Sequence, residues 1–285
     1  MLKKITEACS RFDLLNNVKH ITVALSGGAD SMALLVALCN SKDSLNLEKI
    51  SAVHFNHQIR GEEALRDQKF AEKQCKELGV KLYLGCADVP CYAKQNHLSV
   101  ELAARKLRYQ FFDSIDTDVI ATAHTASDNI ETVLFNLTRG TALSGLCGIP
   151  PKRDRYIRPL ILCTREDVET YCAENNIDFV TDSTNLCDDY TRNKIRHSVV
   201  PVLKSFNASA ENSVSRMTAS LREDEDFING IVLKEYNSLC KENGLQLTSF
   251  KNLHPAIAKR IIVKYCYEQC VSVDNFHINQ IYGIC

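Results

Sequence analysis

The stretch from Ile21 to Leu38 constrains the fold more than any other part of this sequence. It reads ITVALSGGADSMALLVAL: an apolar, β-branched run ends at Ser26, two glycines follow, and a second apolar run begins after Ser31. A buried strand that leads through a glycine turn into a helix is typical of sheets covered by helices. Gly27 and Gly28 allow positive φ and close approach of the backbone to a ligand. We therefore expect a strand, a tight loop and a helix here.

The first two thirds of the chain repeat this alternation. Apolar runs predict strands at 20–26, 49–55, 80–86, 118–123 and 157–162, and helical periodicity predicts helices at 30–40, 61–79, 99–115 and 125–138. The pattern predicts an α/β fold that is doubly wound around a mainly parallel, five-stranded sheet, with ligands at the carboxyl ends of the strands. After about residue 205 the pattern becomes helical, with one or two long helices over 208–240. We therefore expect a domain at 1–205 and a smaller helical domain at 206–285.

Composition narrows the class of protein. The 285 residues carry a formal net charge of −1, so bulk charge neither requires nor excludes a nucleic acid. Apolar runs are too short for a membrane span, and the N-terminal segment lacks the apolar core of a signal peptide. Thirteen cysteines without a C-x-x-C pair favour reduced thiols over disulfides. We expect a cytoplasmic protein with no membrane association.

The glycine loop is suited to an anion. Free N–H groups and the positive end of the helix dipole favour a phosphate there, and the hydroxyls of Ser26 and Ser31 add donors. The loop matches neither G-x-x-x-x-G-K-S/T nor G-x-G-x-x-G. Asp30 would repel a phosphate unless a divalent cation lay between them, and Mg²⁺ characteristically takes one or two carboxylates plus substrate phosphates. The alternative is that Asp30 merely caps the helix.

A second motif, DVIATAHTASDNIETVLFNLTRG, spans 118–140. His124 falls at the carboxyl end of the expected strand, and Asp128 and Glu131 follow at offsets that align all three on one helix face. Two carboxylates there could hold a protonated amine or a metal. The alternative is a solvated acidic first turn, which the helix dipole also favours.

Two further segments are expected to lie near this edge of the sheet. In ELAARKLRY, Arg105 could face the sheet and meet a carboxylate or a phosphate, or could belong to an ordinary surface helix with ion pairs. In HFNHQIRGEE, His54, His57 and Arg60 follow the second strand. Two histidines could begin a zinc site, but no third ligand follows nearby.

Two basic segments stand out in a nearly neutral chain. PPKRDRYIRP and YTRNKIRH carry the cations Lys152, Arg153, Arg155, Arg158, Arg192, Lys194 and Arg196. Such runs are commonly just solvated. Tyr156 and Tyr190 lie beside them and could stack on bases, which favours contact with RNA.

The glycine loop resembles the pyrophosphate (PP) loop of the ATP pyrophosphatase superfamily, and the motifs together resemble the tRNA(Ile)-lysidine synthase family. The matching pieces, in order, are SGGADS, HFNHQIRGEE, ELAARKLRY, ATAHTASDNIETVLFNLTRG, GIPP, IRPL and DSTNLCDDYTRNKIRH, and they cover about residues 20–205. The resemblance implies an adenine nucleotide hydrolase-like fold. It also implies a ligase that joins lysine to carbon 2 of the wobble cytidine of tRNA(Ile) with anticodon CAU. ATP first adenylates the base, and the products are lysidine, AMP and pyrophosphate.

Roles carried over by position are likewise implied by the resemblance. ATP is expected at Ser26, Gly27, Gly28, Ala29, Asp30, Ser31, His57 and Arg60, with Mg²⁺ at Asp30. Catalysis and L-lysine binding are expected at Arg105, Asp128 and Glu131, with Asp30 also catalytic. The two basic segments, independently of the resemblance, predict tRNA binding at Lys152, Arg153, Arg155, Arg192, Lys194 and Arg196. The sequence departs from the family at Thr125, Ser127 and Asn129, where histidine, aspartate and glutamine are usual.

Alternatives stay open at this point. One is a PP-loop enzyme that thiolates tRNA, although such enzymes generally use paired cysteines and C-x-x-C is absent. Another is a non-catalytic relative that binds nucleotide or RNA, against which Asp30, Asp128 and Glu131 count. A homodimer is compatible with either. Many lysidine synthases continue into a further C-terminal domain, so a truncated chain or a short form is expected.

Overall fold

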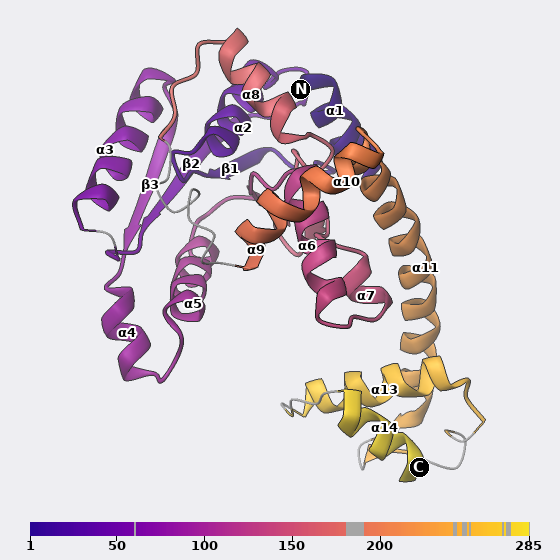
Figure 1. Ribbon diagram of the computed structural model, residues 1–285. Coiled ribbons are helices and arrows are strands. Elements are labelled where there is room, and N and C mark those ends of the chain that lie inside the picture. The colour runs from indigo at the N-terminus through magenta and orange to yellow at the C-terminus, as the bar shows by residue number, and fades with distance from the viewer. Residues whose placement is uncertain are drawn as a thin grey trace. The chain divides into compact units, whose positions relative to one another are not determined.

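The computed structural model describes residues 1–59, 61–180, 191–241, 244–246, 250, 252–269, 271 and 275–284. They form two compact units, one of Met1–Thr141 with Gly148–Arg216 and the other of Ala142–Cys147 with Met217–Cys285. Figure 1 shows the sheet in the first of these units. We predict that the domain at 1–205 binds ATP and carries out catalysis and that the helical domain at 206–285 contacts tRNA, and both roles stay predictions.

The first unit is built on a six-stranded sheet with the order β3-β2-β1-β4-β6-β5. The strands are β1 His20–Ala24, β2 Lys49–Asn56, β3 Lys81–Cys86, β4 Val119–Ala121, β5 Lys152–Arg153 and β6 Tyr156–Ile157. Pairing is parallel from β3 through to β6, while β5 pairs antiparallel with β6. The predicted α/β class and mainly parallel sheet are therefore confirmed.

Two details of the sheet differ from the prediction. The strand expected at 157–162 ends at Ile157, because the chain then turns and Ile161 N–H donates to the carbonyl of Arg158. The short edge strand β5 was not predicted, since the polar pair Lys152–Arg153 shows no apolar alternation. These two residues form one side of a hairpin whose turn residue, Asp154, has a φ of +54°.

Strand order places the ligand-binding edge. β1 lies between β2 and β4, and Val23 is in register with Ala52 on one side and Ala121 on the other. The segments that leave β1 and β4 therefore emerge side by side at the carboxyl edge, where such folds bind their ligands. This order brings the glycine loop and the His124 segment together.

Helices cover both faces of this sheet, as the alternation predicted (Figure 1). The helices of the first unit are α1 Leu2–Arg11, α2 Ala29–Asn40, α3 Glu62–Glu77, α4 Val89–Gln95, α5 Val100–Asp113, α6 Ala126–Thr138, α8 Arg165–Glu174, α9 Thr191–Lys194 and α10 Val200–Phe206, with a π-helical turn at Ile195–Val199. The four predicted helices correspond to α2, α3, α5 and α6. α2 is apolar on nearly every side because it is enclosed in the core, where Met32, Leu34 and Leu35 are fully buried.

The described part of the second unit is helical, with a small antiparallel pair of strands. It contains α7 Leu143–Leu146, the larger part of α11 Ala210–Leu239, β7 Cys240–Lys241, β8 Gly244–Leu245, α13 Pro255–Glu268 and α14 Asn275–Ile284. Val232, Tyr236, Phe250 and Ile261 form its buried core. The helical pattern predicted after residue 205 is confirmed. No helix among the described residues is long and apolar enough to cross a membrane.

Candidate active site at the carboxyl edge of the sheet

The loop after β1 is held in shape by its own serines. The hydroxyl of Ser31 accepts a hydrogen bond from Ser26 N–H at 3.2 Å and donates to the carbonyl of Gly28 at 3.0 Å. Ser31 is only 3% exposed, so it shapes the loop from beneath. Gly27 has a φ of +90°, a conformation that a side chain would strain.

The start of α2 leaves backbone donors open. Its N-cap is Gly28, and among the described residues no side chain caps the helix. Asp30 lies inside the first turn and does not cap it, contrary to the simpler interpretation of the sequence. The first-turn N–H groups and the helix dipole together make an anion site at this point.

The surroundings of Asp30 disfavour the charged form of its carboxylate. Burial, helped by the negative charge of Asp128, raises the pKa of Asp30 to about 6, against the opposing charges of Arg165 and Arg196. A cation beside Asp30 would relieve this penalty, and carboxylate oxygens are the ligands that Mg²⁺ prefers. Among the described residues no group of three or more His, Cys, Asp or Glu side chains is arranged to hold a metal ion.

Asp128 has two oxygens with different contacts. Thr125 is the N-cap of α6, and its hydroxyl accepts from the N–H of Asp128 while its own N–H donates to Asp128 Oδ2 at 2.9 Å. This reciprocal capping box fixes the carboxylate at the start of the helix. Oδ1 faces Arg196 instead, at 3.7 Å from Nη2. Thr125, which stands where the family usually has histidine, thus supplies the cap that holds Asp128, a role that the sequence analysis did not predict.

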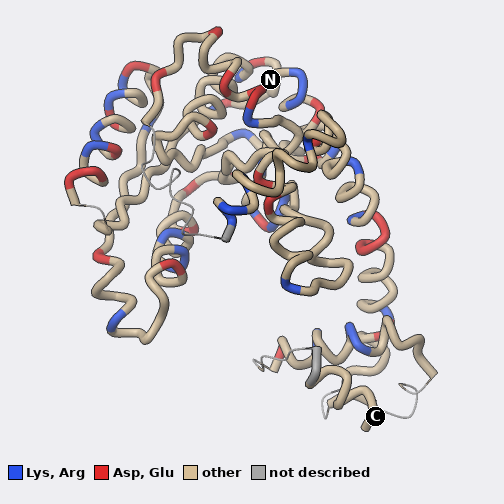
Figure 2. Tube along the Cα trace, in the orientation of Figure 1, with Lys and Arg blue, Asp and Glu red and all other residues tan. Residues whose placement is uncertain are grey.

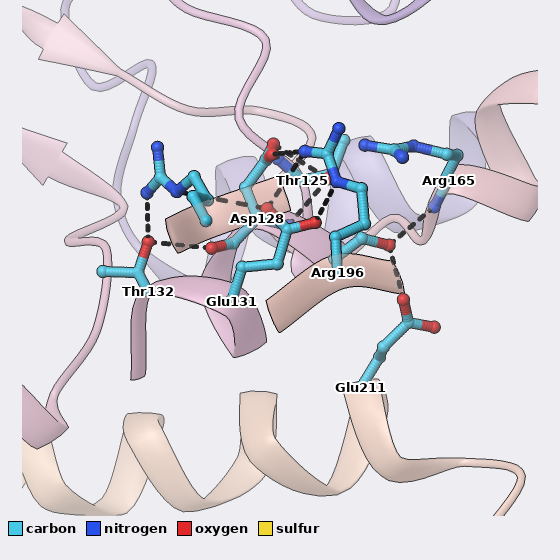
Figure 3. A network of polar contacts seen from close by, with 9 residues as sticks. Thr125, Asp128, Glu131, Thr132, Arg165, Arg196 and Glu211 are labelled. Atoms are coloured by element: carbon cyan, nitrogen blue, oxygen red, sulfur yellow. Dashed lines mark hydrogen bonds and ion pairs between the residues drawn. The ribbon is translucent and has the colours of Figure 1, made fainter. Parts of the chain in front are cut away.

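Glu131 lies one turn further along α6 and is 2% exposed. Arg196 donates to both of its oxygens, from Nε to Oε1 at 2.5 Å and from Nη2 to Oε2 at 3.0 Å. Arg192 Nε lies 4.0 Å from Oε2 and its Nη2 donates to Thr132 Oγ1 at 2.6 Å. Figure 3 shows Arg196 reaching Asp128 and Glu131 together. The two carboxylates face one side of α6, as their spacing predicted, and hold a cation from the chain itself.

A second set of polar contacts, around Ser127, lies at the start of the same helix. Ser127 donates to Glu211 Oε1 at 2.6 Å and accepts from Arg165 N–H at 3.0 Å (Figure 3). Lys204 pairs with Glu211 Oε2 at 3.0 Å. Serine at 127 is therefore matched to a carboxylate brought by α11, and an aspartate there would meet it with like charge.

His124 lies between β4 and α6, where the sequence predicted it. Burial lowers the pKa of His124 to about 4, against the opposing charge of Asp128, so its imidazole is neutral at pH 7. Its Nδ1 lies 3.0 Å from Thr122 Oγ1. His124 thus adds a polar, uncharged group to the edge.

The other predicted ligand residues are less closely grouped. His54 is buried with Nδ1 donating to the carbonyl of Leu25, and the ring of His57 lies edge-on to Phe55 at 4.9 Å. Arg60, like Tyr190, lies outside the described residues. Arg105 is exposed, and its guanidinium stacks on Tyr109 at 4.8 Å. It makes no hydrogen bond or ion pair with the α6 carboxylates in the part of the chain that the structure describes.

The predicted tRNA-binding cations divide into two groups. Lys152, Arg153, Arg192 and Lys194 are exposed. Arg155 instead donates to the carbonyls of Ile115 at 2.8 Å and Thr117 at 2.6 Å, which ties the β5–β6 hairpin to the segment before β4. Arg196 binds the α6 carboxylates, as described above. Sequence reasoning assigned Arg196 to RNA and did not find Glu211, because no local pattern links either residue to α6.

The comparisons with known proteins agree with this geometry. A family model described as a PP-loop domain matches residues 1–203. The chain belongs to the PP-loop family. It is 36% identical over 293 residues to a tRNA(Ile)-lysidine synthase of Clostridium perfringens, with 100% of this chain and 62% of the relative aligned. It is 37% identical to the synthase of Caldanaerobacter subterraneus, with 92% and 58% aligned.

These curated relatives are longer proteins, and this PP-loop chain spans about three fifths of their length. Among solved structures, the U34-tRNA thiolase of Methanococcus maripaludis aligns with a TM-score of 0.60 at 18% identity, covering 78% of this chain and 79% of the thiolase. At that identity the likeness concerns the fold.

Proposed function

We propose that this chain carries the catalytic machinery of a tRNA(Ile)-lysidine synthase, which uses ATP to join L-lysine to carbon 2 of the wobble cytidine. The observation that carries the proposal is that the uncapped start of α2 and the carboxylates of α6 lie at the same edge of the sheet. α2 offers N–H groups for an anion beside Asp30, and α6 presents Asp128 and Glu131 for a cation. The named relatives support the same reaction.

In the first step the loop 26–31 holds the phosphates of ATP through its backbone N–H groups, with Ser26 at the surface and Ser31 fixing the loop. We assign His57 to the nucleotide as well, and the prediction that Arg60 binds ATP concerns a residue outside the described ranges. Bound Mg²⁺ would be held by Asp30 and would neutralise phosphate charge. The oxygen on carbon 2 of the cytidine attacks the α-phosphorus, and the bond to pyrophosphate breaks.

In the second step the lysine ε-nitrogen forms a bond to carbon 2, and the bond from carbon 2 to the AMP oxygen breaks. Lysine arrives as an ammonium ion, so it needs a carboxylate partner that later takes or passes on a proton. Asp128 Oδ1 suits this role, because Oδ2 is occupied by the helix cap while Oδ1 meets only Arg196 among the contacts described. The ammonium would exchange with Arg196 at Asp128 and Glu131.

The experiment is mass spectrometry of nucleosides after incubation of tRNA(Ile) with the protein, ATP, Mg²⁺ and lysine. Lysidine supports the proposal. Thiocytidine formed with a sulfur donor would favour the thiolating alternative, and ATP binding without any modified base would favour a non-catalytic relative. Asp30→Ala should remove the product, whereas Asp43→Ala, at an exposed acid, serves as the matched control. The proposal includes a cytoplasmic location, where the tRNA substrate is found, and a homodimer would be tested by sedimentation.

A further inference from the structure

Three arginines lie around the acidic start of α6, and two of them are bound to carboxylates. Arg196 donates to both oxygens of Glu131, and Arg192 lies 4.0 Å from the same group. Figure 2 shows the basic positions of α9 beside the acidic positions of α6. Arg165, the first residue of α8, differs, because its guanidinium makes neither an ion pair nor a hydrogen bond with any residue that the structure describes. This guanidinium is therefore available to a ligand.

The side chain of Arg165 points into the candidate active site. Figure 3 shows it extending toward Arg196 and the carboxylates of α6. α8 packs against α2, and the thiol of Cys172, two turns after Arg165, lies 3.9 Å from the carbonyl of Ala29 at the start of α2. Asp30 follows directly, and burial raises its pKa while the positive charge of Arg165 opposes that rise. Arg165 thus faces the helix start where we expect the anion.

An unpaired guanidinium beside an uncapped helix start is suited to a phosphate. The backbone N–H groups of α2 bind a phosphate along the helix dipole, and a guanidinium can add two parallel, charged hydrogen bonds. The glycine loop at 26–31 contains no lysine or arginine, and its own Asp30 would repel a phosphate. Arg165 supplies the positive charge that the loop lacks.

The position of Arg165 depends on Ser127, the second residue of α6. The Ser127 hydroxyl accepts from Arg165 N–H at 3.0 Å and donates to Oε1 of Glu211, in the first turn of α11, at 2.6 Å. Because a carboxylate only accepts, Glu211 fixes the direction of the hydroxyl proton and leaves the oxygen lone pairs for Arg165. Glu211 is 5% exposed, and Lys204 binds its other oxygen at 3.0 Å. The start of α8 is thereby tied to the start of α6.

We propose that Arg165 binds a phosphate of the nucleotide, and that Glu211, acting through Ser127, positions Arg165 for this contact. The inference rests on the ATP site of the proposed function and does not depend on which base or amine reacts. Glu211 itself touches no substrate in this assignment. The motifs did not indicate either residue, because α8 and α11 lie far from the glycine loop in sequence.

The test of the phosphate contact measures binding of ATP with Mg²⁺, and of adenosine, to the full chain by equilibrium dialysis. Arg165→Ala should weaken ATP binding about 10- to 100-fold, in the range of a hydrogen bond to a charged group, and should leave adenosine binding unchanged. Arg11→Ala, at an exposed arginine that ends α1, is the matched control. Wild-type affinity for ATP in Arg165→Ala would overturn the proposal, as would an equal loss for ATP and adenosine.

Ser127→Ala and Glu211→Ala test the positioning role. Each should weaken ATP binding about 3- to 10-fold, in the range of one neutral hydrogen bond, and neither should weaken it further once Arg165 is alanine. Glu211→Gln should recover most of the loss, because its amide oxygen still accepts from Ser127. Lys4→Ala is the control, since it breaks the ion pair with Asp167 at the same end of α8 and leaves Ser127 in place. Equal losses with and without Arg165 would refute the positioning role.

Lysidine formation is scored separately from ATP binding. ATP binding that depends on Arg165, in a protein that forms no lysidine, would refute the proposed function and leave the phosphate contact standing. Lysidine from a protein whose Arg165→Ala variant binds ATP like wild type would refute this inference alone.

Discussion

The guanidinium of Arg196 holds the carboxylate of Glu131 through two hydrogen bonds, at 2.5 and 3.0 Å, and lies 3.7 Å from Asp128 Oδ1. A cation from the chain thus occupies the carboxylates that we assign to the lysine ammonium. Exchange of one cation for another keeps these carboxylates paired, which matters because Glu131 is buried. The stability of the fold and the binding of lysine therefore depend on the same two carboxylates.

Breaking this pair from one side should destabilise the fold. Glu131→Gln and Arg196→Gln should each lower the free energy of unfolding by about 3 kcal/mol, because each leaves the remaining charge with only its longer contact, from Arg196 to Asp128 or from Glu131 to Arg192. The double variant should lose clearly less than the sum of the two, since neither charge remains. Urea unfolding of the four proteins measures the coupling. Strictly additive losses would contradict the direct pair.

Asp128 can be tested without disturbing the helix. Asp128→Asn keeps an oxygen for the Thr125 cap but removes the charge, so kcat/KM for lysine should fall about 100-fold while adenylate formation continues. In wild type, an analogue without the ε-amine should be rejected by roughly 10⁴-fold, and ornithine should lose about 1–3 kcal/mol. Thr125→Ala is the control, because it costs about 1 kcal/mol of stability through the cap and keeps the carboxylate. Unchanged use of lysine by Asp128→Asn would assign the carboxylate another role.

Asp30 predicts a pH profile of stability. Its pKa is raised from 3.8 to about 6, chiefly by burial, so the folded state holds the proton more tightly than the unfolded chain. Stability of the ligand-free protein from this group is therefore greatest below pH 4 and is lost as pH rises towards 6. Asp30→Asn should match wild type at pH 4 and exceed it by about 1–3 kcal/mol at pH 7, while losing adenylation. Thermal melts across pH measure the difference. Equal stability at pH 7 would show that the folded protein does not raise the pKa of Asp30.

The pKa of His124 predicts that stability changes with pH in the opposite direction. Burial lowers its pKa from 6.5 to about 4, so here the unfolded chain binds the proton more tightly. Its contribution to stability is present above pH 6.5 and is lost as pH falls towards 4. His124→Asn should remove this loss, so that the variant gains on wild type on acidification. Melts from pH 7.5 to 4.5 decide it, and parallel profiles would mean that the pKa of His124 is the same in the folded and the unfolded protein.

Local pattern predicted those parts of the molecule that depend on neighbours in sequence. The strand, loop and helix around Ser26 and the Asp128–Glu131 face follow from apolar periodicity and spacing of three and four residues. Arg196 and Glu211 reach α6 through the folding of distant segments, and no periodicity marks such contacts. The same limit explains why the sequence did not predict the contacts of Arg155. Its neighbourhood in sequence resembles a solvated basic run, but its guanidinium donates to backbone carbonyls.

The basic hairpin allows a test that separates RNA contact from folding. Lys152 and Arg153 are exposed, whereas Arg155 donates to the carbonyls of Ile115 and Thr117. Arg153→Ala should therefore leave the melting temperature unchanged and reduce the slope of log affinity for tRNA against log salt by roughly 0.7–0.9, which is the effect of one lost phosphate contact. Lys152→Ala should act in the same direction on the slope.

Arg155→Ala should do the reverse, because its loss removes the donors of two partly buried carbonyl groups, at a cost of about 1 kcal/mol each. Its melting temperature should fall while the salt slope measured below that temperature stays near the wild-type value. Filter binding across a range of salt concentrations, combined with thermal melts, gives both quantities for each variant. A salt slope that Lys152→Ala and Arg153→Ala leave untouched would place the tRNA surface elsewhere on the protein. A reduced slope in Arg155→Ala without loss of stability would show that its guanidinium leaves those carbonyls when RNA binds.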